Sequence, residues 1–193
     1  AAVYYPSGVL CEMNRPTINP FWHIGSFLGA LTKGRKGFHL TDADFTGTTT
    51  RPIDAASFVG LFISRRAIEK VGYPDASLFI YGDDVLYTLD IRKAGGMIEF
   101  DPALRYEHDC ESTEPDRKVY TPIWRAYYHH RNLFFVYRKA AGIMVWPALA
   151  LILPRWFALA KAYGKDAPVF RALLRRAIRD GLRRDTSLSL SDV

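Results

Sequence analysis

The 193-residue sequence has only two cysteines, Cys11 and Cys110, which are too few to form a disulfide framework. Their positions also lack the close spacing of a cysteine-based metal site. The first residues have neither the basic region nor the long apolar run of a secretory signal peptide. We therefore expect the protein to work in a reducing compartment. Because the sequence starts in strand-like residues without an initiator methionine, we also expect it to be part of a longer protein.

Acidic residues are scarce near the C-terminus: residues 155–184 contain nine lysines and arginines but only Asp166 and Asp180. Residues 1–154 are balanced, with 17 basic and 16 acidic residues, although the whole chain has a net charge of +6. A main body without a basic surplus predicts that nucleic acid is not a partner. The local surplus predicts an anionic partner for the C-terminal segment.

The apolar run at residues 140–153 is interrupted by Pro147 and is shorter than the ~20 residues of a transmembrane helix. After Asp166-Ala-Pro168, apolar residues recur at the spacing of one helix face. They are Val169, Phe170, Leu173, Leu174, Ala177, Ile178 and Leu182, with Arg171, Arg175, Arg176 and Arg179 on or beside the other face. Such a basic amphipathic helix predicts a peripheral anchor on an anionic membrane surface. The alternative is a solvated helix face packed on the main body.

The composition, 49% hydrophobic and 24% charged, is typical of a globular protein. The apolar run at residues 58–63 predicts a buried strand. A helix capped by Ser64 and ended by Gly72 should follow it. Residues 97–100 and 104–108 predict two more strands. This alternation of strands and helices predicts an α/β fold.

Two other regions precede and follow these predicted strands and helices in the sequence. Residues 32–51 have loop-like composition, rich in glycine and threonine. Thr121 and Pro122 are typical of a helix N-cap and first helical position, so a helix should run from there toward residue 138.

Two adjacent carboxylates, Asp83 and Asp84, follow an apolar segment that begins at Leu78. The residues after them have helical periodicity as far as Gly95-Gly96. Neighbouring acids repel each other unless a cation, a proton or a helix N-terminus offsets the repulsion. The pair is therefore a candidate for metal binding or general-base chemistry. The alternative is a purely structural N-cap and first-turn acid.

The acid pair belongs to a combination of segments spread over residues 58–139. They are Phe58-Val-Gly-Leu-Phe-Ile-Ser-Arg-Arg-Ala-Ile-Glu-Lys-Val-Gly72, Leu78-Phe-Ile-Tyr-Gly-Asp-Asp-Val85, Arg92-Lys-Ala-Gly95, Tyr106-Glu-His-Asp109 and Tyr127-Tyr-His-His-Arg-Asn-Leu133. Together they resemble glycosyltransferase family 2. Within that family the chain is most similar to bacterial rhamnosyl- and galactofuranosyl-transferases, which extend cell-surface polysaccharides.

The resemblance implies a GT-A fold, an inverting reaction and a nucleotide-diphosphate sugar as donor. It implies that Asp84 is the general base that deprotonates the acceptor hydroxyl, and that Asp83 holds the acceptor or tunes its neighbour. It also implies that His108 helps to bind a divalent cation, Mg²⁺ or Mn²⁺, at the donor diphosphate. The acceptor would be a glycan or a lipid-linked molecule, and the protein would act peripherally at the cytoplasmic face of the inner membrane.

The sequence departs from the family in its first part. The family's nucleotide-binding half carries an Asp-x-Asp metal motif well before the segment that matches residue 58. Asp42-Ala-Asp44 has the required letters, but it lies close to the acid pair and in loop-like sequence. We therefore expect a solvated turn there and a missing donor half. The expected organisation is a partial GT-A domain over residues 1–120, the acceptor side, followed by a helical region over residues 121–193.

Other interpretations stay open. Trp22, His23 and Tyr81 are candidates for an acceptor subsite because aromatic rings stack on sugars, whereas core packing is the simpler role for them. Tyr81-Gly-Asp-Asp84 is also the letter pattern of a polymerase palm, but the residues after it have helical periodicity. A third hypothesis is a non-catalytic membrane-binding module that retains the fold.

Overall fold

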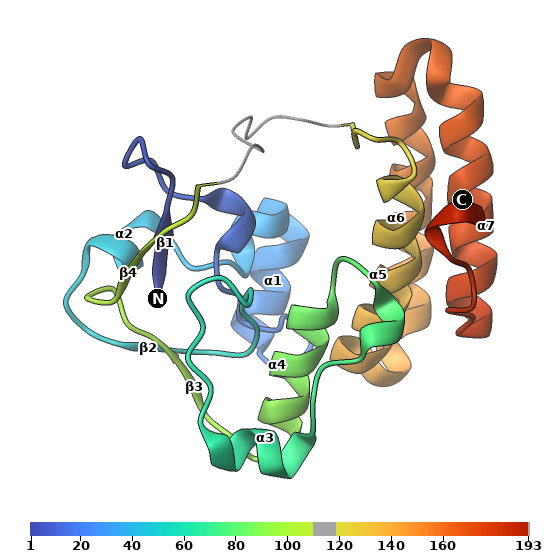
Figure 1. Cartoon of the computed structure of the whole chain (residues 1–193). Coiled ribbons are helices and arrows are strands. Elements are labelled where there is room, and N and C mark those ends of the chain that lie inside the picture. Colours follow the sequence, from blue (N-terminus) through green and yellow to red (C-terminus); the bar gives the residue numbers. More distant parts are fainter. Residues whose placement is uncertain (110–118, 193) are drawn as a thin grey trace. The chain divides into compact units, whose positions relative to one another are not determined.

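The computed structural model describes residues 1–109 and 119–192 (Figure 1). The chain forms two compact units. The first consists of Ala1–Pro74 and Asp84–Pro115, and the second of Asp75–Asp83 and Asp116–Val193. The segment before the acid pair therefore belongs with the C-terminal helices, a grouping that no local pattern predicted.

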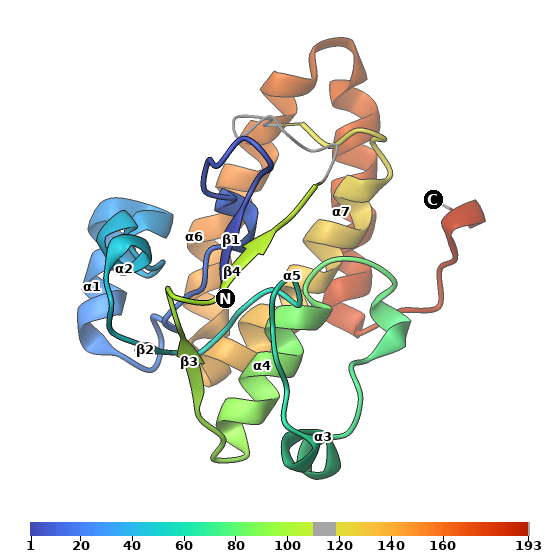
Figure 2. The same cartoon turned by 60° about the vertical axis from the view of Figure 1, so that its left-hand side comes forward.

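The first unit contains two small sheets. Strands β1 (Ala2–Tyr4) and β4 (Arg105–Glu107) pair in parallel and lie side by side in Figure 2. Strands β2 (Arg51–Ile53) and β3 (Ile98–Phe100) pair antiparallel. The positions of β3 and β4 confirm the two strands predicted after the acid pair.

Four α-helices and two 3₁₀ helices complete this unit. They are the 3₁₀ helix Glu12–Asn14, α1 (Ile24–Lys33), the 3₁₀ helix Gly34–Gly37, α2 (Asp42–Thr46), α3 (Arg65–Val71) and α4 (Asp83–Lys93), of which only the first residue belongs to the second unit. The core between them includes Phe45 and Phe100, whose ring centroids are 4.7 Å apart. Tyr87 and Ile91 of α4 are buried in the same core, so α4 is fixed by its apolar side chains.

Helix α3 confirms the prediction of a capped helix. The Ser64 hydroxyl accepts a hydrogen bond from the Ala67 N–H at 3.2 Å, and Gly72 ends the helix with a φ of 79°. Positive φ is readily adopted by glycine because it has no Cβ. The end of α4 also lies where the sequence predicted it, just before Gly95.

Two predictions about this unit are wrong. Residues 58–63 form a turn and an irregular segment, not a strand: the Leu61 N–H bonds to the Phe58 carbonyl, and Gly60 has a φ of 69°. Phe58 packs edge-on against Tyr87, which explains the apolar residue without a strand. Residues 32–51 are not a loop throughout, since α2 begins where Thr41 and Asp44 form a capping box.

The second unit is helical. Its elements are the 3₁₀ helix Ala76–Leu78, α5 (Arg125–Ala141), the 3₁₀ helix Gly142–Met144, α6 (Val145–Ala158), the 3₁₀ helix Leu159–Asp166, α7 (Ala167–Arg183) and the 3₁₀ helix Leu190–Asp192. Helix α5 begins at Arg125, three residues later than the predicted first helical residue, Pro122. Helix α7 begins at Ala167, within the Asp166-Ala-Pro168 segment that preceded the predicted amphipathic residues.

Helices α5 and α7 pack closely along one another, as Figures 1 and 2 both show. Gly181 permits this approach: a Cβ at this position would lie 2.6 Å from the Phe134 ring and 3.0 Å from the Arg131 carbonyl oxygen. Phe170 and Leu174 on α7 are buried within the second unit. The α/β class and the GT-A fold predicted for the chain as a whole remain predictions.

Candidate functional site

The acid pair forms the first turn of α4. Asp83 is the first residue of the helix and Asp84 the second, and both side chains are half-buried. One oxygen of the Asp84 carboxylate accepts a hydrogen bond of 2.7 Å from the Val85 N–H. The free N–H groups and the dipole of a helix N-terminus stabilise negative charge, so this position favours two carboxylates that would otherwise repel each other.

The backbone at Asp84 is fixed from within the first unit. The Thr88 hydroxyl donates to the Asp84 carbonyl oxygen at 2.8 Å, one turn along α4. The same hydroxyl oxygen accepts the Ala56 N–H at 3.3 Å, and the Tyr87 hydroxyl donates to the Gly72 carbonyl at 2.8 Å. These bonds attach α4 to two neighbouring segments and hold the Asp84 backbone in place.

The residues directly before the pair have unusual backbone conformations. The φ angles are 66° at Phe79, 70° at Tyr81 and 82° at Gly82. Positive φ is strained for an aromatic residue, and such strain persists only where surrounding contacts enforce it. Strained segments concentrate at functional sites, which makes the segment 79–82 notable.

A buried asparagine on α5 supplies the enforcing contacts. The Asn132 side-chain amide donates to the carbonyl oxygens of Leu78 at 3.0 Å, Ile80 at 2.8 Å and Tyr81 at 2.9 Å. Arg131, which is fully buried, donates to the Leu78 carbonyl at 3.1 Å and to the Asn132 side-chain oxygen at 2.9 Å. These hydrogen bonds hold the backbone from Leu78 to Tyr81, which lies two residues before Asp83.

Arg131 and Asn132 were not among the residues predicted to matter. They do lie in the Tyr127–Leu133 segment that contributed to the resemblance. The signal available in the sequence was an adjacent Arg-Asn pair within an aromatic segment, because polar groups that such a helix buries require hydrogen-bond partners.

Tyr81, a predicted acceptor residue, lies in an aromatic group of the second unit. Its ring is 5.6 Å from the His129 ring and 6.0 Å from the Tyr120 ring, centroid to centroid. Partial burial raises the pKa of the Tyr81 hydroxyl, and the charge of Arg125 opposes this shift. The phenol therefore stays protonated at neutral pH and can donate a hydrogen bond.

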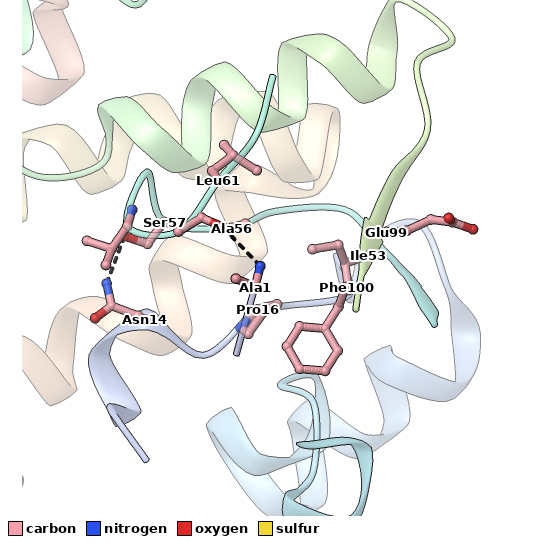
Figure 3. A pocket seen from close by; sticks show the side chains of 11 residues that line it. Ala1, Asn14, Pro16, Ile53, Ala56, Ser57, Leu61, Glu99 and Phe100 are labelled. Atoms are coloured by element: carbon pink, nitrogen blue, oxygen red, sulfur yellow. Dashed lines mark hydrogen bonds between the residues drawn. The ribbon is translucent and has the colours of Figure 1, made fainter. Parts of the chain in front are cut away.

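His108, the predicted metal ligand, follows β4 in the first unit and is half-buried. Its Nδ1 lies 3.1 Å from the Asn14 side-chain oxygen, which also accepts from the Cys11 thiol at 2.9 Å. The Asn14 amide nitrogen donates to the Ser57 hydroxyl at 2.8 Å (Figure 3). A protonated Nδ1 can donate to the Asn14 oxygen that faces it, and this tautomer leaves the Nε2 lone pair as a possible ligand.

Asn14 also lines a small pocket of the first unit, drawn in Figure 3. Other lining residues are Ala1, Pro16, Ser57 and Phe100. The lining includes neither Asp84 nor His108, so this pocket is not the predicted site.

Among the predicted site residues, His108 offers a single imidazole as a ligand for a divalent cation. Within residues 1–109 and 119–192, no three His, Cys, Asp or Glu side chains gather where they could hold a metal ion. A cation bound through substrate phosphates and water needs few protein ligands, as is usual for Mg²⁺. His108 is compatible with that shared mode of binding and not with a closed protein cage.

The side chains of Asp42 and Asp44 form ion pairs and hydrogen bonds at the start of α2. Asp42 pairs with Arg15 at 2.7 Å, and Asp44 pairs with Arg51 at 3.3 Å. The Asp44 carboxylate also accepts hydrogen bonds from the N–H and hydroxyl of Thr41, both at 2.7 Å. Although burial opposes it, these hydrogen bonds and the arginine charges lower the pKa of Asp44. The expected solvated turn is thus replaced by a capped helix.

His23, another predicted acceptor residue, bonds to the buried carboxylate of Asp54, which was not among the predicted site residues. Its Nε2 is 2.8 Å from one Asp54 oxygen, and the Arg92 Nε is 2.9 Å from the other. Trp22 is half-buried, and its backbone N–H donates to the Asn19 carbonyl. His23 is exposed, and its bond to Asp54 holds the ring in one orientation at the surface.

The arginines predicted for a membrane surface are on α7. Arg171, Arg175 and Arg179 are exposed, and Arg176 is half-buried. Arg179 also pairs with the buried Asp180 at 2.9 Å. The apolar face of α7 that was expected to face lipid is largely internal instead.

Comparison of the chain with protein-family models, with curated proteins and with solved structures gives no match.

The structure bears on the polymerase alternative. A palm carries its Tyr-Gly-Asp-Asp segment on a hairpin, whereas Asp83 and Asp84 here begin an eleven-residue helix. The palm interpretation therefore loses its structural basis.

Proposed function

We propose that this chain carries the acceptor-activating side of an inverting glycosyltransferase. The donor is a nucleotide-diphosphate sugar bound with Mg²⁺ or Mn²⁺, and the acceptor is a glycan or lipid-linked molecule of the bacterial cell surface. The reaction takes place at the cytoplasmic face of the membrane. The observation that supports this most is the acid pair in the first turn of α4, preceded by the strained segment 79–82 that Asn132 clamps.

The chemistry assigned to the pair is a single displacement. Asp84 takes the proton from the acceptor hydroxyl while that oxygen forms a bond to the anomeric carbon, and the bond to the diphosphate oxygen breaks. One base on the face opposite the leaving group is sufficient for inversion. Asp83, next to it at the helix start, accepts a hydrogen bond from a second acceptor hydroxyl.

A bound Mg²⁺ or Mn²⁺ would supply charge neutralisation at the departing diphosphate. His108 would hold it through Nε2, while its Nδ1 faces the Asn14 side-chain oxygen at 3.1 Å. Phosphate oxygens and water would supply the other ligands, because no three His, Cys, Asp or Glu side chains gather in the described part of the chain.

Calorimetric titration of UDP and of dTDP, each with Mn²⁺, tests the donor side of the proposal. We expect metal-dependent binding that weakens by about tenfold or more in His108→Ala, and less strongly in Asn14→Ala. Glu69→Gln is the control, because it changes an exposed side chain of the same unit that the proposal does not use. Equal binding by His108→Ala and the wild type would refute the ligand assignment. Absence of metal-dependent binding by the wild type would remove the donor site from this chain.

A non-catalytic membrane-binding module is the second candidate. The observation that favours it is the apolar side of α6, which includes Ile143 just before the helix and Leu151 within it, and which is exposed. Such a module would bind anionic vesicles but would bind no nucleotide diphosphate in the presence of Mn²⁺.

A further inference from the structure

One side of α6 is apolar and exposed, and Ile143 of the preceding 3₁₀ helix extends this exposed apolar surface. Ile143 is 90% exposed, Trp146 60% and Leu151 58%. The exposed residues from 143 to 158 recur at spacings of three and four, so they share one helix face. They are Ile143, Met144, Trp146, Pro147, Ala150, Leu151, Pro154, Arg155, Phe157 and Ala158, which we call the α6 face.

The opposite side of α6 is apolar as well, but it is buried in the second unit. Val145, Leu149 and Trp156 point inward, and Trp156 stacks near Tyr137 with ring centroids 6.3 Å apart. By length and composition alone, the helical stretch Arg125–Arg183 is long and apolar enough to cross a membrane, and 22% of an 18-residue apolar segment within it is buried. A soluble monomer rarely leaves a continuous apolar strip of this kind uncovered without a binding role.

Charge identifies the kind of surface that would cover the α6 face. Residues 120–184 contain thirteen lysines and arginines but only Asp166 and Asp180 as acids, and Asp180 is buried. Arg155 is the one charged member of the face, and Lys161 and Lys165 follow its end, both exposed. Long basic side chains at the rim of an apolar face keep their charged ends at the level of anionic headgroups while their stems lie on apolar surface.

We propose that the α6 face binds the surface of a bilayer containing anionic phospholipid. The helix lies in the plane of the membrane and does not cross it. Its 14 residues span about 21 Å, short of the ~30 Å hydrocarbon core, and its inner side is already packed against protein. Trp146 enters the interfacial layer, where an indole ring is favoured.

This inference changes the role expected of α7. Phe170, Leu174 and Ala177 on the apolar face of α7 are fully buried, so α7 cannot insert that face into lipid without leaving its own core. Its arginines add long-range attraction, while α6 supplies the apolar contact. The inference does not depend on the acid pair or on glycosyl transfer.

A second copy of the chain is a poorer occupant. A symmetric contact through the α6 face would bring two strongly basic surfaces together, with like charges at the rim. An anionic lipid surface has the complementary charge and requires no hydrogen-bonding groups from the apolar strip.

Flotation with phosphatidylcholine vesicles, with and without phosphatidylglycerol, tests the proposal on the wild-type chain and on Ile143→Ser/Leu151→Ser. The double variant keeps the net charge, so it separates apolar insertion from attraction by the arginines. We expect binding to anionic vesicles to fall by about tenfold or more. Phe62→Ser/Met97→Ser is the matched control, because these side chains are 79% and 85% exposed in the other unit, and it should bind like the wild type.

Trp146 provides a second readout in the wild-type chain that does not require the Ile143→Ser/Leu151→Ser variant to fold. Brominated lipid should quench the part of the fluorescence that Trp146→Phe removes. Unchanged flotation of Ile143→Ser/Leu151→Ser, equal loss in the control pair, or no quenching of Trp146 would overturn the proposal. A stable dimer in sedimentation that this double variant abolishes, without vesicle binding, would overturn it in favour of self-association.

Discussion

Replacing Asn132 by alanine should release the segment that leads into the acid pair. The Asn132 amide has two donor hydrogens, which serve the three carbonyl oxygens of Leu78, Ile80 and Tyr81, and its oxygen accepts from the Arg131 Nε. The side chain is 1% exposed, so water cannot replace these bonds without opening the structure.

The expected cost follows from that count. Two donor bonds and one acceptor bond contribute about 1 kcal/mol each to stability, and the carbonyls left unpaired add a desolvation penalty. We therefore expect the free energy of unfolding to fall by about 3 kcal/mol or more. Much of this loss should be local, because the positive φ angles at Phe79 and Tyr81 are no longer enforced.

Urea unfolding measures the global effect, and hydrogen exchange of the amides at residues 79–82 measures the local one. Phe134→Leu is the matched control: it alters a fully buried side chain on the same helix, away from the clamp. This control should lose stability without selective exchange at residues 79–82. A loss below about 1 kcal/mol in Asn132→Ala, or exchange at 79–82 no faster than in the control, would refute the clamp.

Two further predictions concern stability. Burial lowers the pKa of His39 to about 4, and the charges of Arg35 and Arg15 add to this shift. The unfolded chain therefore binds a proton at His39 near pH 6.5, whereas the folded protein does not. This contribution to stability should be fully present near pH 7 and should fall as the pH drops from about 6.5 toward 4. The unfolding midpoint of His39→Gln should lack this part of its pH dependence. An identical pH dependence in the variant and the wild type would exclude His39 as the source. Gly181→Ala should cost about 1–3 kcal/mol in thermal unfolding, because its Cβ would meet the Phe134 ring at 2.6 Å. Gly25→Ala on α1, where a Cβ meets nothing within 4 Å, should be neutral or slightly stabilising, and equal effects of the two changes would contradict the close packing of α5 and α7.

Local signals in the sequence predicted the local structure well. The Ser64 cap, the Gly72 stop and the helix after the acid pair depend on residues within one or two turns of each other. The apolar run at residues 58–63 misled because periodicity alone cannot distinguish a strand from an irregular segment with a buried aromatic residue. Phe58 is apolar because it packs on Tyr87, while Phe62 of the same run is exposed.

The support around the candidate site could not be predicted in the same way. Asn132 acts on residues more than 50 positions away, and Asn14 is 94 positions from His108. No pattern within a segment encodes such pairs. The exposure of α6 is a similar case: the sequence shows an apolar run, but only the packing of α5 and α7 reveals which side of it stays uncovered.

The most direct test of the central claim is sugar transfer by the protein carrying Asp84→Asn. The assay uses UDP- and dTDP-sugars with Mn²⁺ and a lipid-linked acceptor, and compares this variant with Asp83→Asn and with Glu69→Gln, an exposed carboxylate on α3. We predict that Asp84→Asn abolishes transfer while folding and nucleotide binding persist, that Asp83→Asn reduces transfer, and that Glu69→Gln has no effect. Full transfer by Asp84→Asn would contradict the assignment of Asp84 as the base.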